Sequence, residues 1–240
     1  MCYQLNHISK TQIHLYKNQI EALESFYPII KDSNIPIENI SFGGGTALAL
    51  YYFQHRLSFD IDLFLSDNQY MNFLSPKLWI DENESFSSNY VEQAHHIGLN
   101  TINNVKIDIL SRPNPHKNIL DNTKSIFNFD FYICSLEDII ANKIVFRKKE
   151  NKARDIFDIA VSVEKYPKLL KELLDKELIT RKDLNDLKES LLDINKEKYH
   201  QQIMIVEPFD EFKKIAENAY DFILSHIDEL DIKHAIRKRK

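Results

Sequence analysis

The sequence predicts an α+β protein in which a mixed sheet flanked by helices is followed by a C-terminal helical bundle. Strand-like alternation of apolar and polar residues is concentrated in the first part of the 240-residue chain, together with turn signals such as Asn103-Asn104. Beyond Cys134 the apolar residues recur at helical spacing and strand signals largely disappear. We therefore expect an α/β domain at residues 1–134 and a helical domain at residues 135–240.

The composition is that of an ordinary globular protein. Hydrophobic residues make up 43% and charged residues 28% of the chain, which argues against a disordered polypeptide. No apolar run is long enough to cross a bilayer and the N-terminus lacks the pattern of a secretory signal, so we expect a cytoplasmic protein with no membrane partner. Two cysteines, Cys2 and Cys134, are too few for a disulfide framework or a cysteine-based metal site.

The charge is unevenly distributed. The net charge of −5 does not by itself indicate a nucleic-acid-binding protein. Residues 146–154 and 236–240 are nevertheless basic, and such patches can hold a phosphate backbone.

Each expected element of the N-terminal part follows from a local pattern. Apolar residues at helical spacing predict a first helix, which Pro36 follows. Period-two alternation and turn residues predict the strands. In chain order we expect a helix at 11–32, a strand at 38–42, a helix at 46–54, a strand at 57–65, a short helix at 69–80, a hairpin of 90–102 and 105–110, and a last strand at 126–133.

The C-terminal part shows helix signals almost throughout. Ser135 and Asp138 have the spacing of a capping box, and Thr180 precedes another apolar periodic segment as an N-cap residue. Helices are expected at 136–149, 152–164, 167–178, 181–193 and 208–230.

Three of the four glycines in the chain are consecutive, Gly43 to Gly45, and they precede the helix expected at 46–54. Glycines allow close approach of the backbone to a ligand, and the unpaired N–H groups at a helix N-terminus favour an anion. A phosphate site is one interpretation. Taken alone, the pattern is better explained by a tight turn.

The next predicted strand carries two carboxylates on one face. Alternation over 57–65 places Asp60 and Asp62 together, about 6 to 7 Å apart at the backbone. Lys106 and Asp108 occupy the polar face of a later strand. Because clustered like charges cost free energy unless a cation compensates them, the three aspartates predict a divalent-metal site, although Asp108 alone is also explained by ordinary alternation.

The order Gly44-Gly45-Thr46, then Asp60-x-Asp62, then Asp108 resembles the polymerase-β-like nucleotidyltransferase superfamily. More narrowly, the segments GGTALAL, HRLSFDIDLF and KIVFRKKENKARDIFDIA resemble the AbiEii/AbiGii-type toxin nucleotidyltransferases. The resemblance covers residues 41–65 and 135–160 well and the strand at 105–110 adequately. It hardly covers the C-terminal helices.

The resemblance implies a polymerase-β-like N-terminal domain, two Mg²⁺ ions and a nucleoside triphosphate substrate. A nucleoside monophosphate would be transferred to a hydroxyl acceptor, by this resemblance tRNA or another RNA, with release of pyrophosphate. A cognate antitoxin would be a partner. The implied metal ligands are Asp60, Asp62 and Asp108, which with Lys143 form the implied catalytic set. The implied nucleotide-binding residues are Gly44, Gly45, Thr46, Arg56, Ser58, Lys143 and Arg147.

Several alternatives stay open. Arg154, Asp155 and Asp158 form a second block that either reaches the site or only braces a helix through an i,i+4 pair of Arg154 with Asp158. Transfer to a small molecule, or a catalytically silent nucleotide-binding or interaction module, is compatible with the same residues. His95 and His96 are adjacent on an expected strand and so face opposite ways, which disfavours a shared metal. The helix expected after Thr46 is aliphatic and offers few polar side chains for recognition of a base or ribose, so the sequence does not indicate which nucleotide is used.

Overall fold

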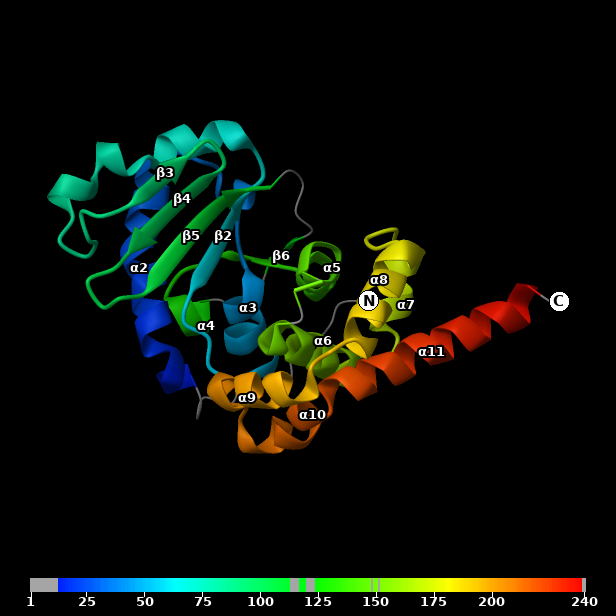
Figure 1. The fold of residues 1–240 in the computed structure, drawn as a ribbon. Coiled ribbons are helices and arrows are strands. Elements are labelled where there is room, and N and C mark those ends of the chain that lie inside the picture. The colour runs from blue at the N-terminus through cyan, green and yellow to red at the C-terminus, as the bar shows by residue number, and fades with distance from the viewer. Residues whose placement is uncertain (1–12, 113–116, 120–123, 148, 151, 239–240) are drawn as a thin grey trace. The chain divides into compact units, whose positions relative to one another are not determined.

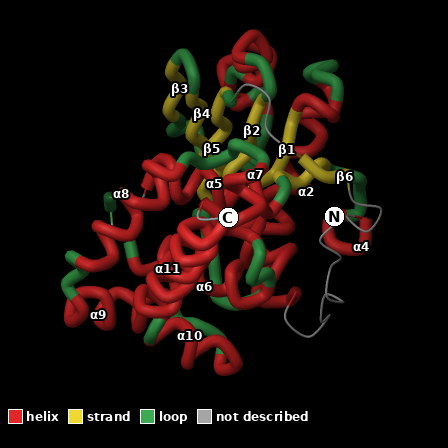
Figure 2. The backbone as a smooth tube through the Cα atoms, turned by 90° about the vertical axis from the view of Figure 1, so that its right-hand side faces the viewer, coloured by secondary structure: helices red, strands yellow, loops and turns green. Residues whose placement is uncertain are grey.

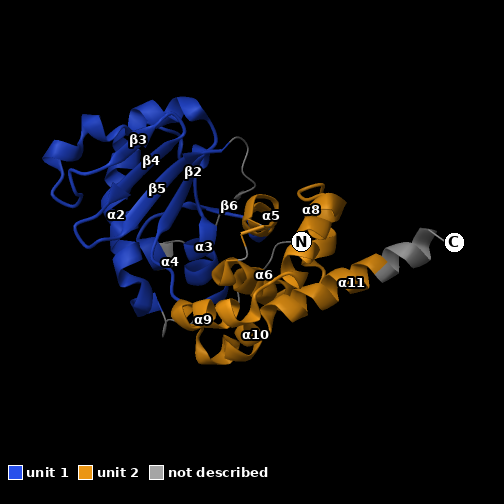
Figure 3. Ribbon diagram, in the orientation of Figure 1, with its two compact units in different colours: residues 1–136 blue, residues 137–240 orange. Residues whose placement is uncertain are grey.

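The computed structural model describes residues 13–112, 117–119, 124–147, 149–150 and 152–238 (Figure 1). The chain divides into two compact units, Met1–Leu136 (unit 1) and Glu137–Lys240 (unit 2) (Figure 3). Unit 1 contains a mixed sheet with helices, and unit 2 is helical. The predicted α+β fold class is confirmed.

Within the described residues, unit 1 forms one seven-stranded sheet in the order β3-β4-β5-β2-β1-β7-β6, most of which can be followed in Figure 2. The sheet is mixed, because β1–β7 and β2–β5 are parallel pairs and the other neighbours are antiparallel. The strands are β1 (Ile40–Gly43), β2 (Ile61–Leu65), β3 (Val91–Gln93), β4 (His96–Asn100), β5 (Lys106–Ser111), β6 (Lys117–Ile119) and β7 (Tyr132–Cys134).

The register brings residues distant in sequence into one row across the sheet. Gly43 pairs with Asp62, Asp62 pairs with Asp108, and Asp108 pairs with Gly98. Directly paired residues place their side chains on the same face of a sheet. Asp62 and Asp108 therefore face the same way from neighbouring strands.

The opposite face of β2 and β5 belongs to the core. Ile61, Leu63 and Leu65 of β2 are fully buried, as are Ile107 and Ile109 of β5. Alternate residues on a strand point to opposite faces, so burial of this apolar set fixes the outward direction of the aspartates.

Helix α2 (Lys17–Asp32) is drawn behind β3, β4 and β5 in Figure 1. Its buried Phe26 packs edge-on against Trp79 and Phe86, with ring centroids 6.0 Å apart in both pairs. The other helical segments of unit 1 are η1 (His14–Tyr16), η2 (Ile37–Asn39), α3 (Gly44–Ala47), the π-helix η3 (Leu48–Phe53), η4 (Asn68–Leu74), η5 (Pro76–Leu78), η6 (Ile80–Glu82) and α4 (Lys124–Phe127).

The structure corrects four element predictions in unit 1. The short helix expected at 69–80 is replaced by the three 3₁₀ segments η4, η5 and η6. The strand expected at 57–65 begins only at Ile61, and Phe59, expected to face the core, is 67% exposed. The strand expected at 90–102 is broken by a turn at residues 94–95. The strand expected at 126–133 is limited to β7, and α4 occupies its beginning. Residues 11–12 of the first predicted helix, Cys2 and residues 113–116 of a predicted loop lie outside the described residues.

Unit 2 is built around α6 (Ala153–Lys165), a helix with ten buried residues that contacts α7, α9, α10 and α11. The helix expected at 208–230 is divided, and α9 was not predicted because its polar, weakly periodic sequence resembles a loop. The other helical segments are α5 (Leu136–Arg147), α7 (Leu169–Asp175), α8 (Arg181–Leu192), α9 (Lys196–Val206), η7 (Asp210–Phe212), α10 (Lys213–Glu217) and α11 (Ala219–Lys238). None of the described helices has the length and apolar character needed to span a bilayer.

Candidate active site

Gly44 and Asp62 are in closer contact than any side chain at position 44 would allow. Gly44 opens α3 with a φ angle of +67°, a backbone conformation that L-residues rarely adopt. A Cβ atom on Gly44 would lie 1.8 Å from Oδ2 of Asp62. The glycine therefore lets the carboxylate of Asp62 lie directly against the start of the helix.

Arg56 lies against the next glycine. A Cβ atom on Gly45 would lie 2.7 Å from an Nη atom of Arg56. Arg56 is only 4% exposed. Its guanidinium donates a hydrogen bond to the carbonyl of Leu57 at 2.9 Å, and its backbone carbonyl accepts one from the hydroxyl of Tyr16 at 2.6 Å. These bonds hold a positive charge beside the first turn of α3.

Thr46 ties α3 to the segment that carries Asp60. Its Oγ1 donates to the carbonyl of Asp60 and lies 2.7 Å from Oγ of Ser58. Because a hydroxyl has one proton to donate, Ser58 must donate to Thr46. Thr46 is only 1% exposed, so its hydroxyl is used to position residues 58–60.

Asp108 is held on both carboxylate oxygens. Nε2 of His96 lies 2.6 Å from Oδ1, and Nζ of Lys106 lies 2.7 Å from Oδ2. The hydrogen bond and the negative charge of Asp108 raise the pKa of Lys106, and the charges of Asp60 and Asp62 add to this shift. All three carboxylates therefore act on the ammonium of Lys106.

Asp60 and Asp62 have the chemistry expected of magnesium ligands. Asp60 is exposed and Asp62 half-buried beside Gly44, and carboxylate oxygens are the ligands that Mg²⁺ prefers. In the described part of the chain, however, no three His, Cys, Asp or Glu side chains converge on a common metal position. The fit is thus good for two carboxylates, while Asp108 is engaged by His96 and Lys106.

Lys143 lies in a buried ion cluster of unit 2. Its Nζ is 2.5 Å from Oδ1 of Asp155 and 2.9 Å from Oδ2 of Asp158, and the side chains are 7%, 5% and 0% exposed. Arg147 lies 3.5 Å from the other oxygen of Asp155. The two helices α5 and α6 are therefore joined by these charges.

The pKa of Asp155 reflects this cluster. Burial alone would raise the pKa, but the charge of Lys143 and its hydrogen bond, together with Arg147, outweigh burial and lower it. Asp155 is consequently held as a carboxylate. Asp158, which the sequence allowed to brace the helix through Arg154, pairs with Lys143 at 2.9 Å, and Arg154 is exposed.

His96 is the residue that sequence reasoning missed. The prediction placed His95 and His96 on one strand, but His95 lies in the turn before β4 and bonds to Asn68 at 2.8 Å. Counting outward from a two-residue turn at Asn103-Asn104 would place Leu99 opposite Asp108 and His96 on the other face. In the structure the turn is one residue longer, since Thr101 bonds to Val105, and the register pairs Gly98 with Asp108; this register brings His96 to the face of Asp108.

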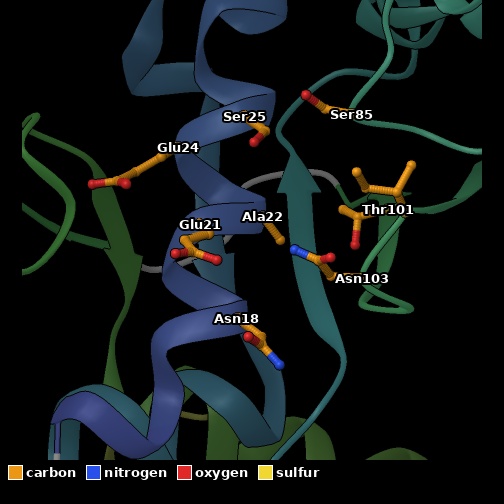
Figure 4. A pocket seen from close by; sticks show the side chains of 9 residues that line it. Asn18, Glu21, Ala22, Glu24, Ser25, Ser85, Thr101 and Asn103 are labelled. Atoms are coloured by element: carbon orange, nitrogen blue, oxygen red, sulfur yellow. The ribbon is translucent and has the colours of Figure 1, made fainter.

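A separate polar pocket of about 380 Å³ lies between α2 and the 101–103 turn (Figure 4). Asn103 points toward α2, whereas Glu24 points away from the turn. Glu24 accepts a hydrogen bond from Asn128 at 2.7 Å, and Glu21 pairs with Lys17 at 3.5 Å. None of the predicted site residues lines this pocket.

The fold resembles solved structures over nearly the whole chain. The crystal structure of JHP933 from Helicobacter pylori matches with a TM-score of 0.52 and 16% identity, covering 98% of this chain and 97% of that one. At this identity the likeness shows the fold alone. MenT4, a nucleotidyltransferase toxin from Mycobacterium tuberculosis H37Rv, matches more weakly, with a TM-score of 0.46, 13% identity and coverage of 85% and 91%. No curated protein sequence matches significantly.

A family model that matches most of the sequence identifies the family of the chain. The family model described as nucleotidyl transferase AbiEii toxin, Type IV TA system, matches residues 36–238. The chain belongs to this family of toxin nucleotidyltransferases, and the resemblance predicted from the sequence motifs is confirmed.

Proposed function

We propose that the protein is a metal-dependent nucleotidyltransferase that moves a nucleoside monophosphate from a triphosphate to a hydroxyl acceptor. The observation that supports this most strongly is the contact of Asp62 with Gly44, which joins a carboxylate to the start of a glycine-opened helix. Family membership supports the same class of reaction.

Asp60 and Asp62 are the proposed ligands of Mg²⁺, and Asp108 is the proposed third carboxylate of the site. Bound divalent cations stabilise charge on the attacking and leaving oxygens of an in-line displacement. Backbone N–H groups at Gly44 and Gly45, with the guanidinium of Arg56 beside them, are suited to the phosphates.

The same row of residues offers a proton acceptor. Asp108 lies in register with Asp62, and its carboxylate is the group proposed to accept the proton of the attacking hydroxyl. In this scheme pyrophosphate is the leaving group.

The roles of Lys143 and Arg147 in neutralising the triphosphate stay predictions. The ammonium of Lys143 is bound by Asp155 and Asp158, so any catalytic use of its charge depends on these two carboxylates. A transfer assay on Lys143→Arg, which keeps the charge, tests this role once the variant is shown to fold.

We further propose RNA, with tRNA as the first candidate, as the acceptor and an antitoxin as a partner. The support is the family, whose description places it in type IV toxin–antitoxin systems. Cytoplasmic location follows from this proposal and stays a prediction.

Incubation with each labelled triphosphate, Mg²⁺ and total tRNA tests the activity. Wild-type protein should incorporate label, and Asp60→Ala/Asp62→Ala should lose at least about 99% of it, since both proposed metal ligands are removed. Lys77→Met, which breaks an ion pair with Glu92 at 2.8 Å away from the proposed site, is the control for a change of surface charge and should retain activity. Equal incorporation by wild type and the double variant would contradict the proposal.

Two further outcomes separate the alternatives. Label incorporated only when small hydroxyl compounds replace RNA would favour small-molecule transfer. Tight triphosphate binding by calorimetry without turnover over any acceptor would favour a silent binding module.

A further inference from the structure

Lys106 lies beside the acidic groups of the proposed metal site and contacts one of them, Asp108. Its Nζ lies 2.7 Å from Oδ2 of Asp108, and Asp108 pairs in register with Asp62 on the neighbouring strand. Lys106 lies two residues before Asp108 on the face of β5 that Asp62 also shares, and the negative charges of Asp60 and Asp62 act on its ammonium. The ammonium therefore supplies positive charge to the three carboxylates.

The side chain of Lys106 is also accessible. It is 48% exposed, whereas the side chain of Asp108 is 15% exposed. A lysine has a flexible stem and an ammonium that can exchange partners, unlike the buried guanidinium of Arg56. Lys106 can thus leave Asp108 without disturbing the core.

His96 makes such an exchange feasible. Its Nε2 lies 2.6 Å from Oδ1 of Asp108, on the oxygen that Lys106 does not contact. Asp108 therefore keeps one hydrogen-bond partner and its orientation when Lys106 moves away.

We propose that Lys106 is the resident counter-ion of the Asp60–Asp62–Asp108 cluster and becomes a ligand of the triphosphate when the nucleotide–metal complex enters. A divalent cation held by these aspartates would supply the positive charge that the carboxylates need, and the ammonium of Lys106 would then be available to the phosphates. His96 is a positioning residue that holds Asp108 during this exchange. The inference rests on the proposed function and adds a substrate-binding residue to it.

This role predicts opposite effects of one substitution on two ligands. Lys106→Met removes a positive charge from the carboxylate cluster, so a cation should bind more tightly. The same change removes a charge from the phosphate site, so an anion should bind more weakly. A lysine that only stabilises β5 would not produce this combination of tighter cation binding and weaker anion binding.

The test uses Mn²⁺ and inorganic tripolyphosphate, because the nucleobase is unidentified. Electron paramagnetic resonance titration of the full chain without nucleotide should show Mn²⁺ binding about tenfold tighter in Lys106→Met than in wild type, a change of about 1.4 kcal/mol. Calorimetry at saturating Mn²⁺ should show tripolyphosphate binding about tenfold weaker. Lys106→Arg, which keeps the positive charge, and Lys77→Met, which removes one elsewhere, should stay within about twofold of wild type in both measurements.

The outcomes distinguish this inference from the proposed function. Unchanged or weaker Mn²⁺ binding in Lys106→Met, or unchanged tripolyphosphate binding, overturns the role of Lys106. If Asp60→Ala/Asp62→Ala binds Mn²⁺ like wild type, the proposed metal site itself fails. Loss of Mn²⁺ binding in that double variant, with Lys106→Met identical to wild type, rejects the Lys106 inference alone. Fluorescence of Trp79, the single tryptophan, verifies that unit 1 of each variant is folded.

Discussion

At the scale of single residues, charge neutralisation distinguishes two groups of aspartates. Asp155 and Asp158 are buried and matched by Lys143 in unit 2. Asp60 and Asp62 in unit 1 are more accessible, and Lys106, which pairs with Asp108, has a side chain that is 48% exposed. A buried carboxylate that loses its partner costs stability, whereas an accessible carboxylate can accept a metal ion.

Lys143→Met should destabilise the protein most strongly near neutral pH. Removing one partner of a buried ion cluster costs about 3–5 kcal/mol, because Asp155 and Asp158 lose their compensating charge. In wild type the lowered pKa of Asp155 contributes stability above its unfolded value of about 3.9, and this contribution disappears as the pH falls through the folded value. In the variant, burial raises the pKa of Asp155 because the charge of Lys143 no longer opposes it. Ionising this buried carboxyl group then costs free energy, so the variant loses stability as the pH rises.

The difference in unfolding free energy between wild type and Lys143→Met should therefore shrink as the pH falls from 7 toward about 4. Urea unfolding followed by circular dichroism at several pH values measures it. Lys171→Met, which removes an exposed partner of Asp175, should change stability by less than about 1 kcal/mol at each pH. A pH-independent difference for Lys143→Met would contradict the assigned cluster.

At the scale of elements, the segment before β2 illustrates where sequence patterns mislead. Perfect alternation over 57–65 predicted one continuous strand, yet Phe59 is exposed and the strand starts at Ile61. Hydrogen bonds from Thr46 and Ser58 replace strand pairing there, so the backbone follows the start of α3. Asp60 consequently belongs to a loop, while Asp62 belongs to the sheet.

Thr46→Val tests whether this connection positions the site. Valine matches the shape of threonine but cannot donate to the carbonyl of Asp60, so the unfolding free energy should fall by about 1–3 kcal/mol and Mn²⁺ affinity should fall with it. Thr46→Ser keeps the hydroxyl and should bind Mn²⁺ within about twofold of wild type. Denaturant unfolding followed by Trp79 fluorescence gives the stability, and identical behaviour of the two variants would refute the connection.

Several element-level predictions succeeded because their signals are local. Thr180 caps α8 with a complete capping box to Asp183, and Asn104 adopts a positive φ of 59° in the hairpin turn. Caps and turns depend on a few adjacent residues. The missed helix α9 and the divided helix at 208–230 depend instead on packing against α6, which leaves little trace in their own sequences.

At the scale of the whole molecule, Trp79 provides a probe of one unit. It is the only tryptophan and lies in unit 1, where its ring packs against Phe26 and Phe86. Its fluorescence therefore reports the unfolding of the unit that carries Asp60 and Asp62.

Mg²⁺ with tripolyphosphate at about 100 times the dissociation constant should stabilise unit 1 by about 2.7 kcal/mol. The Trp79 unfolding transition should then rise by about 5–10 °C, since each kcal/mol shifts a protein of this size by about 2–4 °C. Asp60→Ala/Asp62→Ala should show no shift. A shift of equal size in the double variant would place the ligand elsewhere.

The sequence by itself determined the α+β class and the family, because motif spacing, alternation and the glycine cluster are properties of neighbouring residues. Tertiary structure decided how the charges are matched. Only strand register places Asp108 beside Asp62 and within reach of His96, and only the packing of α5 on α6 buries Lys143 between two carboxylates. Electrostatic effects depend on distance and burial, and both arise from contacts between segments far apart in the chain.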